Sequence, residues 1–445
     1  MIASKLQLIW RLKAAAKRWS VQQRKSSTNC DLAIIGGGII GTAIGRQLKL
    51  DLNHLNIQVL EKGGCLGGHQ SSHNSGVMHC GIYYPPGSLK ARLCVQGIDL
   101  LQRYCSLKGI SYNKCGKLIV ASDCNEAELL NCLLERARDN QVEDVELLDS
   151  LGAIQGKSTG CRGVRALWCA RTANVSFRNV TQAFGTDFQE AGGIIHLNTE
   201  IVGLRQSCNC EYPLELTREH GETIGAKFAI LCGGLQAARL THWVEGEPPK
   251  SSPQLISLKV DYLRVAAKYC DHLSTNVYPV PDWGAPFLGA HFSPQSDGNV
   301  LLGPWAVPAL KLEGYSNDEI NMPYLAQVLG SCNFRNMVRR NFSKCVHQAS
   351  KALCPDVQIK ELQKLMPNFS YQFAEKGPSA VQCQLVNLDG SFVDDFVFEM
   401  FRGTGVRQRV VNLKFTPSPA ATSCMSIAEL IAQEVKNKLD CTALG

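Results

Sequence analysis

Three glycines and a glutamate near the N-terminus could hold the phosphates and sugar of a dinucleotide. Gly36, Gly38 and Gly41 are spaced as G-x-G-x-x-G, and Glu61 lies 20 residues after Gly41. In such a motif the first glycine allows a tight turn, the second lets a pyrophosphate approach the backbone, and the third lets a helix pack closely on a strand. The carboxylate can accept the ribose hydroxyls and would repel a 2′-phosphate, so an NADP-type ligand is not expected.

A second group of reactive side chains follows directly, in a stretch rich in glycine and serine. It contains His69, His73 and His79 and the adjacent Tyr83 and Tyr84. Because the stretch follows the expected ribose-binding strand, we expect it to cross a bound dinucleotide toward its reactive ring. A neutral imidazole has a pKa suited to a general base. His79 is therefore the candidate base. No metal site is expected, because the histidines are spread along a flexible loop without an acidic partner.

The elements around the glycines are those that a dinucleotide-binding βαβ unit requires. An apolar run at 32–35 predicts a strand, the apolar spacing over 39–48 predicts a helix, and a second apolar run at 57–60 ends on Glu61. The glycine motif alone is weak, but strand, turn, helix, strand and acid here occur in order. The alternative is a glycine-rich turn in an ordinary βαβ unit.

The wider pattern predicts an α/β fold: a doubly wound, Rossmann-like dinucleotide-binding domain with a mixed, β-rich substrate domain. Proline-rich turns and alternating apolar residues dominate 251–310, and such a β-rich insertion suits a domain that covers a ligand. We expect the dinucleotide-binding domain to comprise residues 30–250, with interspersed cap elements, and 376–440. The substrate domain is expected at 251–375.

Two further features of the chain bear on this domain. An apolar strand at 227–234 ends on Gly233 and Gly234, where the backbone could again approach the dinucleotide, or simply turn after a buried strand. A single strand is expected over 194–204, in a hairpin with 214–217.

The formal charge of +7 belongs to the N-terminal segment. Residues 1–30 hold seven of the 46 basic residues and no acid, so the remainder has 39 residues of each sign. A basic, serine-containing segment without a long apolar core is typical of a mitochondrial transit peptide, which we place at 1–29. The alternative is a disordered basic arm or a membrane-surface helix. A nucleic-acid surface is not expected, since the excess charge lies in this segment.

The sequence has neither a candidate membrane-spanning stretch nor a paired cysteine motif. No stretch reaches the roughly 18 uninterrupted apolar residues of a spanning helix, so we expect a soluble body, at most peripheral to a membrane. The 20 cysteines form no C-x-x-C pair and are expected to be reduced.

Several longer segments carry a family resemblance. They are HNSGVMHCGIYYPPGSLKARLCVQG (73–97), SYNKCGKLIVA (111–121), FQEAGG (188–193), NVYPVPD (276–282), FLGAHFSP (287–294), DGNVLLGP (297–304), GSFVDDFVFE (390–399) and PSPAATS (417–423). Together with the glycine motif they resemble the L-2-hydroxyglutarate dehydrogenase family, part of the D-amino-acid-oxidase-like flavoproteins. The resemblance runs from about residue 30 to 440.

The resemblance implies FAD as the cofactor and oxidation of L-2-hydroxyglutarate to 2-oxoglutarate in mitochondria. Electrons would pass to an acceptor other than NAD(P), with the respiratory chain as a candidate. The reaction needs a base for the C2 hydroxyl proton, the flavin N5 for the hydride, and cations for two carboxylates. The candidate substrate contacts are Tyr83, Tyr84, Lys259, Tyr278 and His291. The candidate FAD contacts are Gly36, Gly38, Gly41, Glu61, Lys62, His73, Asn74, Ser75, Gly233, Gly403 and Gly405.

The chain departs from the family pattern in its C-terminal half. Lys259 and Gln382 stand where the family carries arginines, and residues 412–417 also differ. A lysine keeps the charge but loses the bidentate fork that suits a carboxylate. Two alternatives follow: a flavin enzyme for another hydroxy or amino acid, and a flavin-binding protein with little catalysis that serves assembly or electron transfer.

Overall fold

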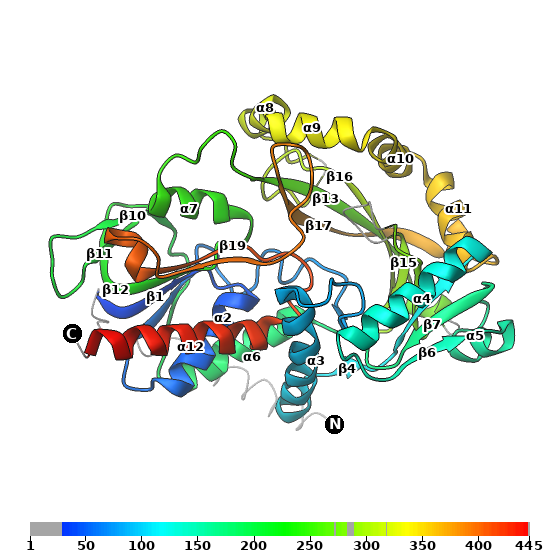
Figure 1. Cartoon of the computed structure of the whole chain (residues 1–445), viewed down its shortest axis with the longest axis horizontal. Helices are drawn as coiled ribbons and strands as arrows, with labels where there is room; N and C mark the ends of the chain where they lie inside the picture. The colour runs from blue at the N-terminus through cyan, green and yellow to red at the C-terminus, as the bar shows by residue number, and fades with distance from the viewer. Residues whose placement is uncertain (1–28, 271–272, 283–288, 317, 444–445) are drawn as a thin grey trace, which may run out of the picture.

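The computed structural model describes residues 29–270, 273–282, 289–316 and 318–443. These residues form two eight-stranded sheets and a three-stranded sheet, with helices on their outer faces (Figure 1). All but the last residue of the predicted transit peptide, 1–29, lies outside the described residues. Within them, no helix is long and apolar enough to cross a membrane.

The first sheet is built on β1 (Cys30–Ile35), which lies between β2 (Ile57–Leu60) and β12 (Thr223–Leu231), both parallel to it. The order is β10-β11-β12-β1-β2-β9, and β19 pairs with β12 and with β18. The remaining strands of this sheet are β9 (Ile194–His196), β10 (Ile201–Gln206), β11 (Leu214–Arg218), β18 (Val397–Met400) and β19 (Val410–Phe415).

Helices α2 (Ile39–Asp51), α6 (Phe177–Glu190) and α12 (Cys424–Ala443) cover one face of this sheet, and Figure 1 shows α12 running along it. The predicted apolar face of α2 is confirmed: Ile44 and Leu48 are fully buried beside Phe184 of α6. Burial of such side chains contributes about 1.5–3 kcal/mol each, which fixes the helix against the strands. The predicted doubly wound architecture is confirmed.

The strand predicted over 194–204 was wrong. It divides into β9, which pairs with β2 at one edge, and β10, which pairs with β11 near the other. The division falls at Asn198, which has φ +53°, a left-handed conformation that asparagine tolerates and that ends an extended strand. The hairpin between β10 and β11 is confirmed.

The second sheet has the order β17-β13-β16-β15-β14-β5-β7-β6. Its strands are β5 (Lys117–Ala121), β6 (Val145–Leu148), β7 (Arg165–Cys169), β13 (Gln254–Val265), β14 (Asn276–Pro279), β15 (His291–Pro294), β16 (Val300–Pro308) and β17 (Ala374–Val386). Thus β5, β6 and β7, which come before residue 250, join the β-rich sheet. The boundary expected at residue 376 falls inside β17, so the chain leaves this sheet only after Val386.

Side chains of the second sheet alternate between two cores. Leu118, Val120 and Val277 pack outward with α11 (Pro355–Leu365), whereas Ile119 and Tyr278 belong to the large core shared with the first sheet's helices. Successive residues of a strand point to opposite faces. Lys117 therefore lies on the same inner face as Ile119.

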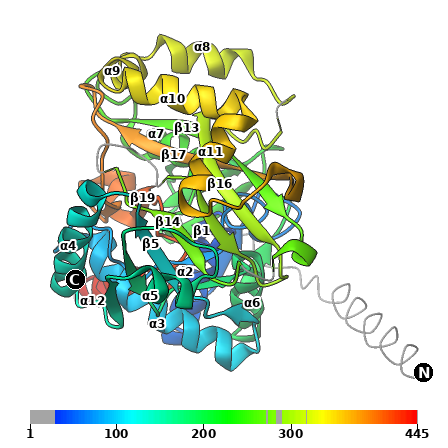
Figure 2. The same cartoon turned by 90° about the vertical axis from the view of Figure 1, so that its right-hand side faces the viewer.

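Helices α8 (Met322–Gly330), α9 (Cys332–Arg340) and α10 (Phe342–Leu353) lie at the opposite end of the molecule from α12 (Figure 2). Helix α3 (Leu89–Lys108) packs on α12, and α4 (Cys124–Asp139) packs on β5, β6 and β7. The small sheet has the order β3-β8-β4, with β3 (Val77–Met78), β8 (Ala173–Val175) and β4 (Tyr112–Asn113). The remaining helices of the described residues are α5 (Leu151–Lys157), α7 (Ala237–Glu245), η1 (Gly234–Gln236), η2 (Ala267–Tyr269), η3 (Tyr371–Phe373) and η4 (Gly405–Arg409).

Candidate active site

The glycine turn after β1 has the packing that the motif predicts. Gly36 has φ +111°, and a Cβ there would lie 2.3 Å from the Cys232 carbonyl oxygen. A Cβ on Gly41 would lie 2.0 Å from the Gly36 oxygen. Both positions are closed to a side chain because the turn is pressed against the end of β12. At Gly38 a Cβ would meet only the Ser71 hydroxyl at 3.3 Å, so this side of the turn is open to a ligand.

The N-terminus of α2 faces the same opening. Gly38 is its N-cap and offers no side-chain oxygen, and the Ile39 N–H donates to Ser71 Oγ at 2.9 Å. The free N–H groups and positive dipole end of such a helix attract phosphate. Ser71, which the sequence analysis did not single out, therefore lies where a pyrophosphate would bind.

Glu61 organises the turn from the end of β2. One carboxylate oxygen accepts the Gly37 N–H at 2.6 Å, and the other accepts the Gly63 N–H at 2.7 Å. The side chain is 7% exposed and lines a cleft of about 760 Å³, a volume that includes open solvent. Each oxygen keeps a lone pair for a ribose hydroxyl.

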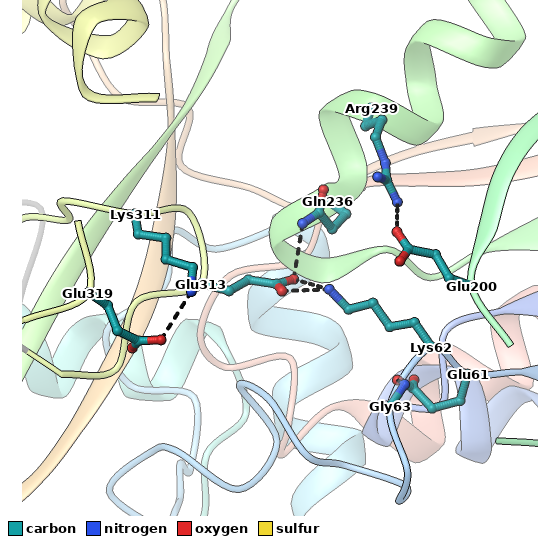
Figure 3. A network of polar contacts seen from close by, with 9 residues as sticks. All are labelled: Glu61, Lys62, Gly63, Glu200, Gln236, Arg239, Lys311, Glu313 and Glu319. Carbon is teal, nitrogen blue, oxygen red and sulfur yellow. Dashed lines mark hydrogen bonds and ion pairs between the residues drawn. The ribbon is translucent and has the colours of Figure 1, made fainter. Parts of the chain in front are cut away.

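The rim of this cleft carries ion pairs from both sheets' connections (Figure 3). Lys62 Nζ lies 2.6 and 2.5 Å from the two oxygens of Glu313, which also accepts from Gln236 at 3.2 Å. Burial acts to raise the pKa of Glu313, but Lys62 outweighs it and holds that pKa below its usual value. Arg239 and Glu200 form a separate pair, 2.8 Å apart. Lys62 thus joins the loop after β2 to the segment after β16, across the cleft.

The loop after Lys62 then contacts the second sheet. The His73 ring lies against Tyr315, tilted by 31° with ring centroids 4.1 Å apart, and its Nδ1 lies 3.1 Å from the Ser379 oxygen of β17. Asn74 bonds only within the loop, donating to the Gln70 and Ser71 oxygens. The Ser75 oxygen accepts from Gln295 at 2.9 Å. These contacts hold the loop against the substrate sheet.

The loop ends at His79, which is pinned through its backbone. Its N–H donates to Thr422 Oγ1 at 3.1 Å, and its oxygen accepts from Cys94 Sγ of α3. The ring Nδ1 is buried and has no hydrogen-bond partner among the described residues. Burial first, then the charges of Lys117 and His291, hold the pKa of His79 well below its usual value. The imidazole is therefore neutral at pH 7, as a base requires.

Four polar groups of the second sheet and its neighbours lie around His79. His291 stacks on Tyr278 with ring centroids 3.8 Å apart, and burial lowers the pKa of His291 to about 3. Lys117 Nζ lies 4.4 Å from the Tyr278 ring centroid and 4.9 Å from that of Tyr83. Like His79, these four groups each leave a buried polar atom without a hydrogen bond among the described residues. The structure therefore brings His79, Tyr83, Tyr278 and His291 together, around a lysine that the sequence analysis missed.

Other predicted residues lie elsewhere. Tyr84 lies near Lys90, whose Nζ is 5.9 Å from its ring centroid. Lys259 is paired with Asp261, at 2.7 and 2.9 Å, so its charge is already balanced. Gly403 and Gly405 lie beside Arg407 and Gln206 and are not part of the cleft lining, whereas Gly233 is.

Comparison with known proteins agrees with this geometry. Residues 31–356 match the family described as FAD dependent oxidoreductase. The mitochondrial L-2-hydroxyglutarate dehydrogenase of Nematostella vectensis is 40% identical over 93% of this chain and 91% of its own. The human enzyme of the same name is 39% identical over 93% and 90%. The chain belongs to the L-2-hydroxyglutarate dehydrogenase family of FAD-dependent oxidoreductases.

Solved structures show the same fold at lower identity. The L-alpha-glycerophosphate oxidase of Mycoplasma pneumoniae, with FAD bound, superposes with a TM-score of 0.72 at 22% identity, covering 92% of this chain and 95% of its own. Glycine oxidase from Geobacillus kaustophilus gives 0.65 at 20%, with the same coverage. The FAD-binding fold predicted from the sequence is therefore confirmed.

The cleft fits the cofactor of this family. The open face at Gly38, the helix N-terminus behind it and the Glu61 carboxylate suit the pyrophosphate and ribose of FAD, and the loop leads from there to His79. Ser71, Glu313 and Lys117 escaped the sequence analysis. A lysine opening an apolar strand, GKLIVA, was the one available sign of Lys117.

Proposed function

We propose that this protein oxidises L-2-hydroxyglutarate to 2-oxoglutarate with bound FAD, and that His79 accepts the C2 hydroxyl proton. The observation that supports the assignment of the base is the His79 ring Nδ1, which is buried without a hydrogen bond among the described residues, in an imidazole whose pKa is held low at the end of the loop after Lys62. The substrate is supported by relatives of that name that match nine-tenths of this chain. Their printed names also support a mitochondrial location.

The bound FAD would supply the acceptor for the hydride that leaves C2. His79 takes the hydroxyl proton as the carbonyl forms, so the substrate loses one proton and one hydride. The stacked Tyr278 and His291 form a wall beside the reacting carbon and exclude water. Once His79 is protonated, its positive charge is repelled by that of Lys117. The protonated form is therefore disfavoured unless a negative charge lies beside the lysine.

The experiment is the visible spectrum of the purified FAD protein during anaerobic addition of substrate. We expect the flavin band to bleach with L-2-hydroxyglutarate and to stay unchanged with the D isomer. No bleaching by either isomer would refute the proposal. Bleaching by an amino acid instead would favour an enzyme for another substrate, an alternative supported by Lys259 being neutralised by Asp261.

We further propose that the electrons pass to a respiratory-chain component. The chain carries a single G-x-G-x-x-G motif, which agrees with one flavin and no nicotinamide site. Turnover with an artificial quinone should therefore exceed turnover with oxygen, measured as peroxide. Equal or faster peroxide formation would show an oxidase.

A further inference from the structure

Lys117 is a buried cation without a counter-ion among the described residues. It opens β5 and is 0% exposed, and its Nζ has no hydrogen-bond partner in the part of the chain that the structure describes. Its neighbours in the sheet are β14 and β7, so it lies in the interior and not at an edge. A buried lysine almost always has a partner, because moving an unpaired charge out of water costs a large free energy.

The groups around Lys117 do not balance its charge. Two tyrosine rings lie within 5 Å and attract the cation weakly through their faces. The ionisable groups that interact with its charge from neighbouring elements are the thiols of Cys80, Cys94, Cys115 and Cys169 and the imidazoles of His79 and His291, and no carboxylate is named among them. Burial lowers the pKa of Lys117 accordingly.

A thiolate is the alternative counter-ion. The hydrogen bond shared with Cys169 first, and then the charge of Lys117, lower the pKa of Cys80 against the effect of burial. Lys117 Nζ nevertheless makes no hydrogen bond to any sulfur of the described residues. The amine instead lies over the rings of Tyr83 and Tyr278, whose hydroxyls are also without a hydrogen bond among the described residues.

We propose that Lys117 binds the C1 carboxylate of the 2-hydroxy acid. This inference rests on the proposed function and names a substrate-binding residue for it. The C1 carboxylate is one bond from C2, whose hydroxyl must reach His79, and the charge of Lys117 acts on His79 more than any other charged group does. The carboxylate would pair the lysine and accept from the neighbouring tyrosine hydroxyls.

The geometry also explains why Lys259 is not the better candidate. In the sheet, β13 is separated from β5 by β16, β15 and β14, which is roughly 19 Å at about 4.8 Å per strand. Lys259 is moreover paired with Asp261. Lys117 is the cation that lies beside the candidate base.

The test is a titration of the oxidised FAD protein with 2-oxoglutarate and with 2-oxopentanoate, followed by the shift of the flavin spectrum. Both ligands carry the C1 carboxylate, and only the first carries a second one. In Lys117→Met we expect affinity for both to fall about 30-fold or more, as when one partner of a buried charge pair is removed. Lys117→Arg should restore most of it. Lys114→Met, an exposed lysine of the preceding loop, should change neither value.

Stability separates a binding role from a structural one. If Lys117 is retained for an anion, Lys117→Met removes an unpaired buried charge, so the ligand-free variant should melt at or above the wild-type temperature. A strongly lowered melting temperature would overturn the inference. Unchanged affinity for both acids in Lys117→Met would also overturn it. So would a variant that loses affinity for 2-oxoglutarate but keeps its affinity for 2-oxopentanoate, because Lys117 would then bind the second carboxylate and not the C1 carboxylate.

The outcomes are distinct from those for the proposed function. Wild-type protein that binds both 2-oxo acids through Lys117 but is not bleached by L-2-hydroxyglutarate would refute the function and keep the inference. Equal flavin reduction by L-2-hydroxyglutarate in wild type and Lys117→Met would keep the function and refute the inference. Cys80→Ser should leave affinity unchanged; a loss equal to that of Lys117→Met would overturn the inference in favour of the thiol.

Discussion

Glu61→Gln should weaken both the glycine turn and FAD binding. The carboxylate accepts two backbone N–H groups, from Gly37 at 2.6 Å and Gly63 at 2.7 Å, in a site that is 7% exposed. A glutamine can accept only one of them, and its NH₂ then faces the other donor. A hydrogen bond to a charged group contributes about 1.5–3 kcal/mol, and a buried unsatisfied donor costs a similar amount. We therefore expect the ligand-free protein to lose about 1.5–3 kcal/mol of stability.

That loss corresponds to a melting temperature lower by roughly 3–12 °C for a domain of this size. FAD affinity should fall about tenfold, because a neutral acceptor replaces a charged one at the ribose, a difference of about 1.4 kcal/mol. The assays are a thermal melt of the flavin-free protein and a fluorescence titration with FAD. Glu200→Gln is the matched control, since that carboxylate pairs with Arg239 at the partly exposed rim and should contribute about 1 kcal/mol or less. An unchanged melt would refute the organising role, and unchanged affinity would refute the ribose contact.

Four further outcomes are expected. His79→Ala should abolish flavin reduction while flavin stays bound, and normal anaerobic reduction would remove His79 as the base. Gly38→Val should give a folded protein without flavin, because a Cβ there meets only a hydroxyl at 3.3 Å but fills the pyrophosphate's approach; full flavin content would contradict this. The pKa of His291 is about 3 in the folded protein and near 6.5 in the unfolded chain. The folded protein therefore loses about 1.36 kcal/mol of stability per pH unit through this residue as pH falls from about 6.5 toward 3. In His291→Asn the urea midpoint should fall less steeply with pH over this range. Glu313→Gln should speed FAD release in stopped-flow dilution and change the melting temperature little, since the ion pair of Glu313 with Lys62 is partly exposed. An unchanged release rate would argue against a role of this ion pair in retaining FAD.

The cofactor site could be predicted because its parts are close in sequence. From β1 through Glu61 the unit spans about 30 residues, and hydrophobic periodicity sets its strand, helix and strand. Each glycine has a steric reason that depends on immediate neighbours or on one adjoining strand. Gly233 was identifiable in the same way, as the turn that ends an apolar strand. Gly403 and Gly405 also lie in a glycine-containing loop, but this loop packs beside Gln206 and not on the cleft.

The substrate pocket could be predicted only in part. His79 was a candidate from its place in the loop, and Tyr278 and His291 were candidate contacts, but the sequence did not show that they meet. The candidate cation was Lys259, which Asp261 neutralises. Lys117 was overlooked because a lysine at the start of a strand is usually a solvent-exposed end.

The sequence by itself therefore determined the family, the cofactor and the βαβ unit, since these depend on short-range spacing and on long matching segments. Tertiary structure decided which cation lies beside the base. Alternation along a strand shows that Lys117 and Ile119 share a face, but not which sheet that strand joins. Only the pairing of β5 with β14, across about 160 residues, turns that face toward His79 and leaves the lysine buried without a partner.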